Sequence, residues 1–252
     1  MSNIGLFGKM PSTGDFVSRG LSPQLCDRMD HLLQAALLAA TSDGPDRRDL
    51  MAQSAPVMVA IRPGALCETG FSGLWYPSCD RVGRVFPICV GLETQPEVGR
   101  LPLMWPSVPL TRVLCQAVAS SLQQNAGPDY LLAHLPTLEQ WMSYCNQDTP
   151  FGGMGDETVP AVSVAESHFC LKGPESQMTV STRALCSRLS WVADVLGTVV
   201  SPDGSVDYFF VSRSLLSWSN LAALFDEKWD YWGWACYKTL AVSPLVVVKN
   251  II

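Results

Sequence analysis

The 252-residue sequence predicts a mixed α/β fold of the α+β kind, in which a largely antiparallel central sheet is flanked by helices. Two segments, 22–40 and 110–122, place apolar residues at helical spacing on one face, which is typical of helices that pack on a sheet. The other segments are shorter, rich in β-branched and aromatic residues, and separated by Gly and Pro turns. A longin-like or profilin-like sheet would suit this order of elements.

The N-terminal half begins with a predicted strand at 3–9, which enters a turn at Pro11–Gly14. Ser22 is a favourable helix N-cap with Pro23 at the first helical position. The helix that follows ends before a polar break at 41–49. Further strands are predicted at 56–62, 75–76 and 85–92.

Pro102, Pro106 and Pro109 form a rigid connector ahead of the second long helix, and we expect a seam in the chain there. This seam divides the sequence into an N-terminal module, residues 1–100, and a helical and β C-terminal part, residues 101–252, packed against it. The other elements predicted in the second part are a hairpin turn at 202–204, a helix from 217–219 to 225, and strands at 159–164, 168–172, 189–193, 206–211 and 245–252.

Composition excludes several classes of function. The net charge is −6 and the 17 basic residues are scattered, so the basic patch of a nucleic-acid-binding protein is missing. No apolar run approaches the roughly 18 residues that would cross a bilayer. The nine cysteines include no C-x-x-C pair and no secretory leader precedes them, so we expect a cytoplasmic protein whose thiols mostly fill the core. Only 16% of residues are charged, against roughly 25% in a typical soluble domain, which suggests a surface covered by a partner.

Two short stretches are dense in Gly, Pro and complementary charge. The first motif is GKMPSTGDF at residues 8–16, and the second motif is PSCDRVGRVFP at residues 77–87. The opening Gly-Lys pair suggests a phosphate loop, but Asn3 and Met10 stand where that loop needs Gly and Ser or Thr. The glycines also have the wrong spacing for a dinucleotide fingerprint. A tight turn between a strand and a helix is therefore favoured.

A nucleophilic active site needs a positioned base, and the histidines available are His31, His134 and His168. None of them neighbours a motif cysteine in the sequence. The His and Cys residues also lack the short paired spacings of a metal site. We therefore expect no catalytic residue, no metal and no cofactor, and we keep as an alternative a hydrolase with a histidine beside Cys79 or Asp80.

If residues 84–92 form a strand, Arg84 points along its apolar side, where a guanidinium needs a carboxylate. Asp80 and Asp15 are the two candidate partners. The motif charges then either brace the two loops or contact a partner, and both interpretations stay open. Residues with one or the other role are Lys9, Asp15, Phe16, Arg19, Asp80, Arg81 and Arg84. The four cations among them would alternatively form a site for an anion or a phosphopeptide.

Near the C-terminus, Phe225, Trp229 and Trp232 have the spacing of one helix face. Such a stripe is more often core than binding surface. Interface cores nevertheless favour Trp and Tyr, so Trp229 and Trp232 are also candidate partner-binding residues.

The two motifs resemble those of the TagF family, also called ImpM, of proteins associated with bacterial type VI secretion. Residues 8–21, GKMPSTGDFVSRGL, are similar to that family's opening G-K-x-P-x-x-G-D-F-V-x-R-x-L. Residues 77–87 are similar to its P-S-x-D-R-V-G-R-x-F-P. The resemblance covers the N-terminal half of the chain, to about Leu92, and is looser beyond it.

The resemblance implies a cytoplasmic, non-enzymatic regulator that represses assembly of the secretion machine after translation. It also implies a partner, the forkhead-associated scaffold protein of the system, and a relation to a threonine kinase and phosphatase pathway. The mechanism expected on this basis is sequestration, in which the protein occupies a scaffold surface that assembly needs and does no covalent chemistry.

Overall fold

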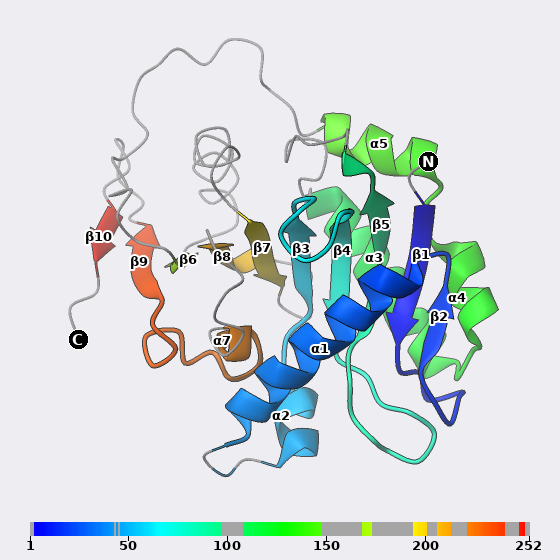
Figure 1. Ribbon diagram of the computed structural model, residues 1–252, viewed down its shortest axis with the longest axis horizontal. Coiled ribbons are helices and arrows are strands. Elements are labelled where there is room, and N and C mark those ends of the chain that lie inside the picture. Colours follow the sequence, from blue (N-terminus) through cyan, green and yellow to red (C-terminus); the bar gives the residue numbers. More distant parts are fainter. Residues whose placement is uncertain are drawn as a thin grey trace.

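The computed structural model describes residues 3–42, 44, 46–96, 108–147, 168–172, 194–200, 206–212, 221–239 and 247–249. Their strands form one ten-stranded sheet in the order β10-β9-β6-β8-β7-β3-β4-β5-β1-β2 (Figure 1). Eight strand pairings are antiparallel, and the pairing of β6 with β9 is parallel. The predicted fold class is confirmed, while the likeness to a longin or profilin sheet stays a prediction.

The elements have the following bounds. The strands are β1 (Asn3–Gly8), β2 (Val17–Arg19), β3 (Val57–Ile61), β4 (Gly70–Tyr76), β5 (Ile88–Thr94), β6 (His168–Lys172), β7 (Val195–Val200), β8 (Val206–Ser212), β9 (Ala235–Thr239) and β10 (Val247–Lys249). The helices are α1 (Pro23–Ala40), α2 (Arg47–Gln53), α3 (Val108–Gln123), α4 (Pro128–His134), α5 (Leu138–Gln147) and α7 (Ala223–Asp226).

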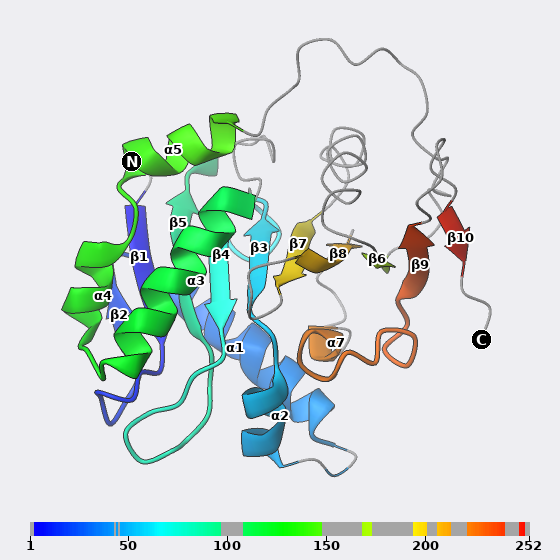
Figure 2. The ribbon, with the colours of Figure 1, turned by 180° about the vertical axis from the view of Figure 1, so that it is seen from behind.

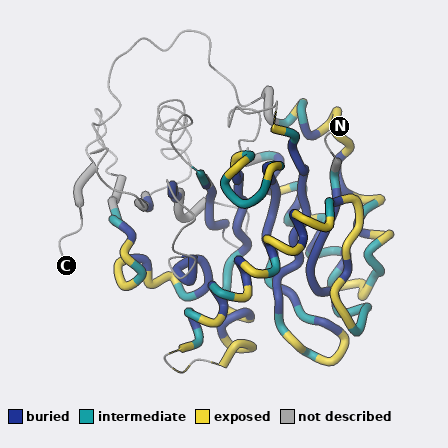
Figure 3. The backbone as a smooth tube through the Cα atoms, viewed as in Figure 1, coloured by how far each residue is buried: buried dark blue, intermediate teal, exposed yellow. Residues whose placement is uncertain are grey.

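The helices cover both faces of the sheet. Helices α1, α2 and α7 lie on the face turned toward the viewer in Figure 1, and α3, α4 and α5 lie on the face seen in Figure 2. Buried strand residues alternate between the two cores: Val57 and Val59 of β3 pack beneath α1, and Met58 packs beneath α3. The strands are accordingly buried along the part of the sheet that both helix layers cover (Figure 3).

Helix α1 begins as the sequence predicts. The Ser22 hydroxyl accepts the N–H of Leu25 at 3.2 Å, and Pro23 occupies the first turn. The buried carboxylate of Glu93 on β5 accepts both the Ser22 N–H (2.7 Å) and the Ser22 hydroxyl (2.6 Å). This contact fixes the start of α1 to the sheet. The apolar positions predicted for its inner face are all buried, namely Leu25, Met29, Leu32, Leu33, Ala36 and Ala40.

The structure corrects the strand predicted at 85–92, which begins only at Ile88. The preceding residues fold back on themselves, because Cys79 forms an isolated antiparallel bridge with Val85 and the Phe86 N–H donates to the Ser78 carbonyl. Backbone groups that pair within this loop are not free to join the sheet ladder. The second motif is therefore a closed loop rather than the start of a strand.

Other predicted boundaries also change. The polar break at 41–49 contains the start of α2, whose N-cap Asp46 accepts the N–H of Arg48 at 2.7 Å. The segments predicted as strands at 168–172 and 206–211 are confirmed as β6 and β8, and β10 lies inside the one predicted at 245–252. The predictions that fall at 102–106, 159–164, 189–193, 202–204 and 217–220 lie outside the described residues.

The sheet continues across the seam predicted near residue 100. Strand β7, from the C-terminal part, pairs with β3, from the N-terminal part, along the whole of Val57–Ile61. The division into two modules stays a prediction, and the backbone hydrogen bonding of the sheet extends through both.

Gly197 on β7 provides a test of this packing. A Cβ at this position would meet the ring of Phe210 and the Met58 carbonyl oxygen. We expect Gly197→Ala to lower the free energy of unfolding by roughly 1–3 kcal/mol, the usual cost of overpacking, as measured by urea denaturation. Gly127→Ala, where nothing lies within 4 Å of the new Cβ, is the control without overpacking. Gly127 is the N-cap of α4, where alanine is less favourable, so this variant should cost at most about 1 kcal/mol.

Candidate functional site

The two motifs lie side by side at one end of the sheet. The first motif connects β1 to β2, and the second connects β4 to β5 (Figure 1). Strands β1 and β5 pair with Gly8 opposite Ile88, so one motif leaves the sheet where the other enters it. Gly8 has a φ of 137°, and a Cβ there would collide with the Pro87 carbonyl oxygen. Only glycine allows the two loops to meet this closely.

Asp80 lies at the centre of the two loops and is 2% exposed. Its carboxylate accepts from Lys9 Nζ at 3.3 Å and from Arg84 Nε at 2.6 Å. The same carboxylate accepts the backbone N–H groups of Val82 (3.1 Å) and Arg84 (2.9 Å). One buried acid thus binds a cation from each motif and also closes the turn of the second motif.

Further hydrogen bonds tie the loops together directly. Each of them ends on a backbone carbonyl oxygen of the first motif: Ser78 Oγ donates to Lys9 (2.8 Å), the Arg81 N–H donates to Thr13 (2.7 Å), and Arg84 Nη2 donates to Gly14 (2.6 Å). We call the assembly of both motifs around Asp80 the loop brace. Its geometry favours the bracing interpretation for Lys9, Asp80 and Arg84.

The loop brace keeps Asp80 ionised. Burial alone raises the pKa of this carboxyl, but the hydrogen bonds from the backbone and guanidinium of Arg84 and from Lys9 outweigh burial. Together they hold the pKa of Asp80 well below its ordinary value of 3.8.

A pH dependence follows from this shift. Because the pKa of Asp80 is lower in the folded than in the unfolded chain, its carboxylate stabilises the fold above about pH 4 and loses that effect as the pH falls further. Arg84→Met removes the guanidinium bond that lowers this pKa but keeps the backbone N–H of residue 84. The urea midpoint of this variant should therefore fall less steeply between about pH 4 and pH 2 than that of the natural chain. Arg19→Met is the control and should keep the natural slope. Equal slopes for Arg84→Met and the natural chain would contradict the role given to Asp80.

Phe16 covers the loop brace on one side. Its ring stacks on Phe7, with centroids 5.6 Å apart, and meets Phe86 edge-on at 4.9 Å. Lys9 Nζ lies 5.0 Å from the centroid of the same ring, within range of a cation–π interaction. Phe16 therefore supports the position of Lys9 while keeping 39% of its own surface exposed.

Asp15 and Arg19 stand apart from the Asp80 network. The Asp15 carboxylate accepts the N–H of Phe16 at 2.8 Å, so of the two candidate partners for Arg84 the structure selects Asp80. Arg19 Nε pairs with the exposed carboxylate of Asp129 on α4 at 3.0 Å. Three of the four cations expected to form an anion site, Lys9, Arg19 and Arg84, are thus bound to carboxylates of the chain itself.

The predicted orientation of Arg84 is wrong. Its side chain is 57% exposed rather than directed along an apolar strand face. The strand period does not apply to Arg84, because it lies in the closed loop that precedes β5. Its guanidinium spans the surface of the loop brace, from Asp80 to the first motif.

The helical stripe predicted for Phe225, Trp229 and Trp232 is also wrong. Helix α7 ends at Asp226, and Glu227 follows in the left-handed region with φ of 55°. Trp229 turns into the core, 3% exposed, with its ring centroid 5.2 Å from that of Trp234. Trp232 is half-buried and donates its indole N–H to Asp226, so the two tryptophans do not share one helix face.

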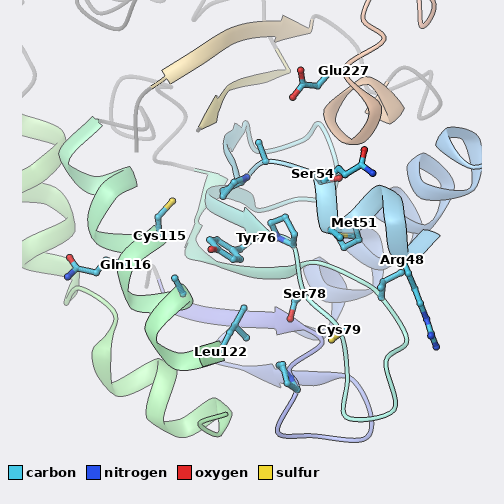
Figure 4. A pocket seen from close by; sticks show the side chains of 18 of the residues that line it. Arg48, Met51, Ser54, Tyr76, Ser78, Cys79, Cys115, Gln116, Leu122 and Glu227 are labelled. Atoms are coloured by element: carbon cyan, nitrogen blue, oxygen red, sulfur yellow. The ribbon is translucent and has the colours of Figure 1, made fainter. Parts of the chain in front are cut away.

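A groove of about 900 Å³ lies beside the loop brace. Figure 4 shows side chains from three sources converging on it: Arg48 and Met51 of α2, the end of β4 with the second motif, and the side of α3. Glu227 enters the lining from the α7 end. Burial raises the pKa of the Cys115 thiol in this lining to about 12, so it is a poor nucleophile at neutral pH.

Two exposed cations flank the loops at this end. A Cβ on Gly83 would lie 3.4 Å from Arg48 Nη2, and a Cβ on Gly14 would lie 3.3 Å from Arg81 Nη2. Within the described ranges no carboxylate pairs with Arg48 or Arg81. Val82, next to Arg81, is 63% exposed. We call Arg48, Arg81 and Val82 the exposed rim.

The histidines with described side chains lie on helices outside the motifs. His31 of α1 pairs with Asp27 one turn away, and His134 of α4 contacts the Tyr130 carbonyl and stacks on its ring. Among the residues that the structure describes, no group of three or more potential metal ligands is found. No helix in this part of the chain is long and apolar enough to cross a membrane.

Sequence reasoning missed Arg48, Met51 and the α3 side chains of the groove. Arg48 lies in a segment read as a polar break, and the α3 residues are separated from the second motif by the predicted seam. Asp46 followed by a charged first turn was the available signal for α2, because Asp is a strong N-cap residue. The joining of these segments into one groove depends on tertiary packing, for which the sequence carries no pattern.

The fold and the site define an α+β protein in which two Gly- and Pro-rich loops are held together by a buried carboxylate. The chain belongs to the TagF N-terminal domain family, type VI secretion system-associated, whose family model matches residues 5–138. The match includes both motifs, α3 and α4, and runs past residue 100.

A solved structure is similar over most of the chain. The crystal structure of PA0076 from Pseudomonas aeruginosa PAO1 has 20% sequence identity and a TM-score of 0.57, covering 88% of this chain and 93% of that one. At this level of identity the likeness supports the fold. A search of curated proteins found no significant match.

Proposed function

We propose that this protein is a non-enzymatic regulator that represses assembly of the type VI secretion system after translation, by binding the forkhead-associated scaffold protein of that system. Membership of a type VI secretion-associated family supports the assignment of the protein to that secretion system. The observation that carries the proposal is that some cations of the motifs bind a carboxylate of the chain itself, whereas another is left exposed. Lys9 and Arg84 bind Asp80, whereas Arg81 is exposed and pairs with no carboxylate among the described residues. Ser78 and Cys79 of the same motif line the groove.

The partner is proposed to bind at the exposed rim and the groove behind it. Arg48 and Arg81 offer two cations, and Val82, next to Arg81 in the chain, offers an exposed apolar side chain. The groove gives room for an inserted segment. Charge complementarity favours an acidic segment of the scaffold protein, since buried or clustered cations at an interface select the opposite charge. The loop brace then acts as a rigid support for this surface.

Binding between the purified full-length chain and the purified scaffold protein tests the proposal. Isothermal titration calorimetry should give a dissociation constant at or below the micromolar range. Absence of binding at protein concentrations of tens of micromolar would overturn the proposed partner. Deleting the gene should increase secretion of the effector proteins of the system, and restoring the natural chain should lower it again.

A further inference from the structure

Two thiols meet in the C-terminal part of the sheet, away from the loop brace and the groove. Strands β6 and β9 pair in parallel, with Cys170 directly opposite Cys236. The two Sγ atoms lie 2.9 Å apart, and no disulfide joins them in the structure. Neighbouring strands lie about 4.8 Å apart, within the Cα separation of about 4.4–6.8 Å that a disulfide needs. The strand pairing already holds the two residues at a distance where a bond can form without a large backbone movement.

The surroundings of the pair favour an internal reaction over reaction with outside thiols. Cys170 is 1% exposed and belongs to the core beneath α1, while Cys236 is half-buried at the edge of the same core. By contrast, Cys26 and Cys67 contact the hydroxyl groups of Ser18 and Thr69. Cys236 is the more exposed of the two thiols, so an oxidant reaches the pair through it. Among the described residues, the Cys170 thiol is placed to attack an oxidised Cys236 sulfur.

We propose that Cys170 and Cys236 are a redox modification site that forms a reversible disulfide with a hydroperoxide as oxidant. The Cys236 sulfur attacks one peroxide oxygen, the O–O bond breaks, and a sulfenic acid and one water are formed from hydrogen peroxide. The Cys170 sulfur then attacks the Cys236 sulfur, and the S–O bond breaks with release of a second water. Two thiols are oxidised by two electrons and one peroxide is reduced. A dithiol reverses the bond by exchange.

The bond would connect β9 covalently to the rest of the sheet. Strand β9 pairs with β6 on one side and with β10 on the other. The β6–β9 contact is the parallel pairing in the described sheet, and parallel pairs are slightly less stable per residue than antiparallel ones. Burial, opposed by the hydrogen bond with Cys170 and supplemented by the nearby Asp230, raises the pKa of the Cys236 thiol to about 11, so its reaction at neutral pH is slow.

Peptide mapping of the full chain tests the proposal. The reduced protein is treated with a small molar excess of hydrogen peroxide, its free thiols are blocked by alkylation, and its peptides are identified by mass spectrometry. We expect a cross-linked peptide that contains Cys170 and Cys236, is lost after treatment with dithiothreitol, and is absent from Cys170→Ser and Cys236→Ser. The matched control Cys67→Ser should keep it.

Other products would overturn the proposal. Alkylation of both residues after oxidation, separate oxidation of each to sulfinic acid, or pairing of either with a third cysteine would each exclude an internal disulfide here. The oxidised protein should also unfold at a higher temperature than the reduced protein. A lower unfolding temperature would contradict the claim that the bond fits the native pairing of β6 with β9.

Discussion

Lys9→Met is expected to lower the free energy of unfolding by roughly 1–3 kcal/mol, because buried Asp80 loses one of its two cations while Arg84 and two backbone N–H groups still bind it. The Lys9 side chain is 9% exposed and lies against the carboxylate of the second motif. A loss of this size is a large fraction of the roughly 5–15 kcal/mol that stabilises a typical domain. Urea denaturation at neutral pH measures it, with the denaturation slope confirming that unfolding stays cooperative.

The control for this prediction is a surface ion pair of the same family motif. Arg19→Met breaks the contact with Asp129, in which both side chains are largely exposed, and should cost at most about 1 kcal/mol. If Lys9→Met and Arg19→Met had equal and small effects, the loop brace would not be the element that holds the two motifs together.

Arg48→Glu/Arg81→Glu is expected to weaken binding to the forkhead-associated scaffold protein by at least about 30-fold, since reversal places two like charges against an acidic segment. The same variant should keep the unfolding midpoint of the natural chain, because neither side chain has an ion-pair partner among the described residues. Calorimetric titration and urea denaturation of one preparation measure the two quantities together.

The matched control is Arg28→Glu on the exposed face of α1, which lines neither the groove nor the loops. It should leave both affinity and stability unchanged. Natural affinity in the double variant would exclude the exposed rim as the binding surface. Loss of affinity in both variants would instead indicate a general effect of net charge.

The elements that were predicted well from the sequence are those whose structure is determined by residues close together in the chain. Helix α1 shows Ser22, Pro23 and a continuous apolar face, and each of these features acts locally. Strand β3 is an uninterrupted apolar run because it is covered by helices on both faces. The motif residues were found for the same reason, since Gly, Pro and charge stand together in short stretches.

The parts that were missed depend on contacts between distant segments. Arg84 was placed on an apolar strand face because the alternation from residue 84 to 92 fits a strand, but hydrogen bonds inside the loop prevail over that pattern. The α7 region was read as a longer helix because its aromatic spacing is helical, yet Glu227 ends the helix in a left-handed conformation. The groove and the meeting of Cys170 with Cys236 depend on tertiary packing and strand register, which no local pattern specifies.

The double variant Lys9→Met/Asp80→Asn tests the central claim most directly, which is that the motif charges stabilise one another across the two loops. An asparagine keeps an oxygen for the backbone N–H groups of Val82 and Arg84 but carries no charge to leave unpaired. Because Lys9 and Asp80 share one interaction, we predict that the stability lost in the double variant is smaller than the sum of the losses in Lys9→Met and Asp80→Asn alone. A double variant that is less stable than both single variants, with additive losses, would show that Lys9 and Asp80 act independently and would contradict it.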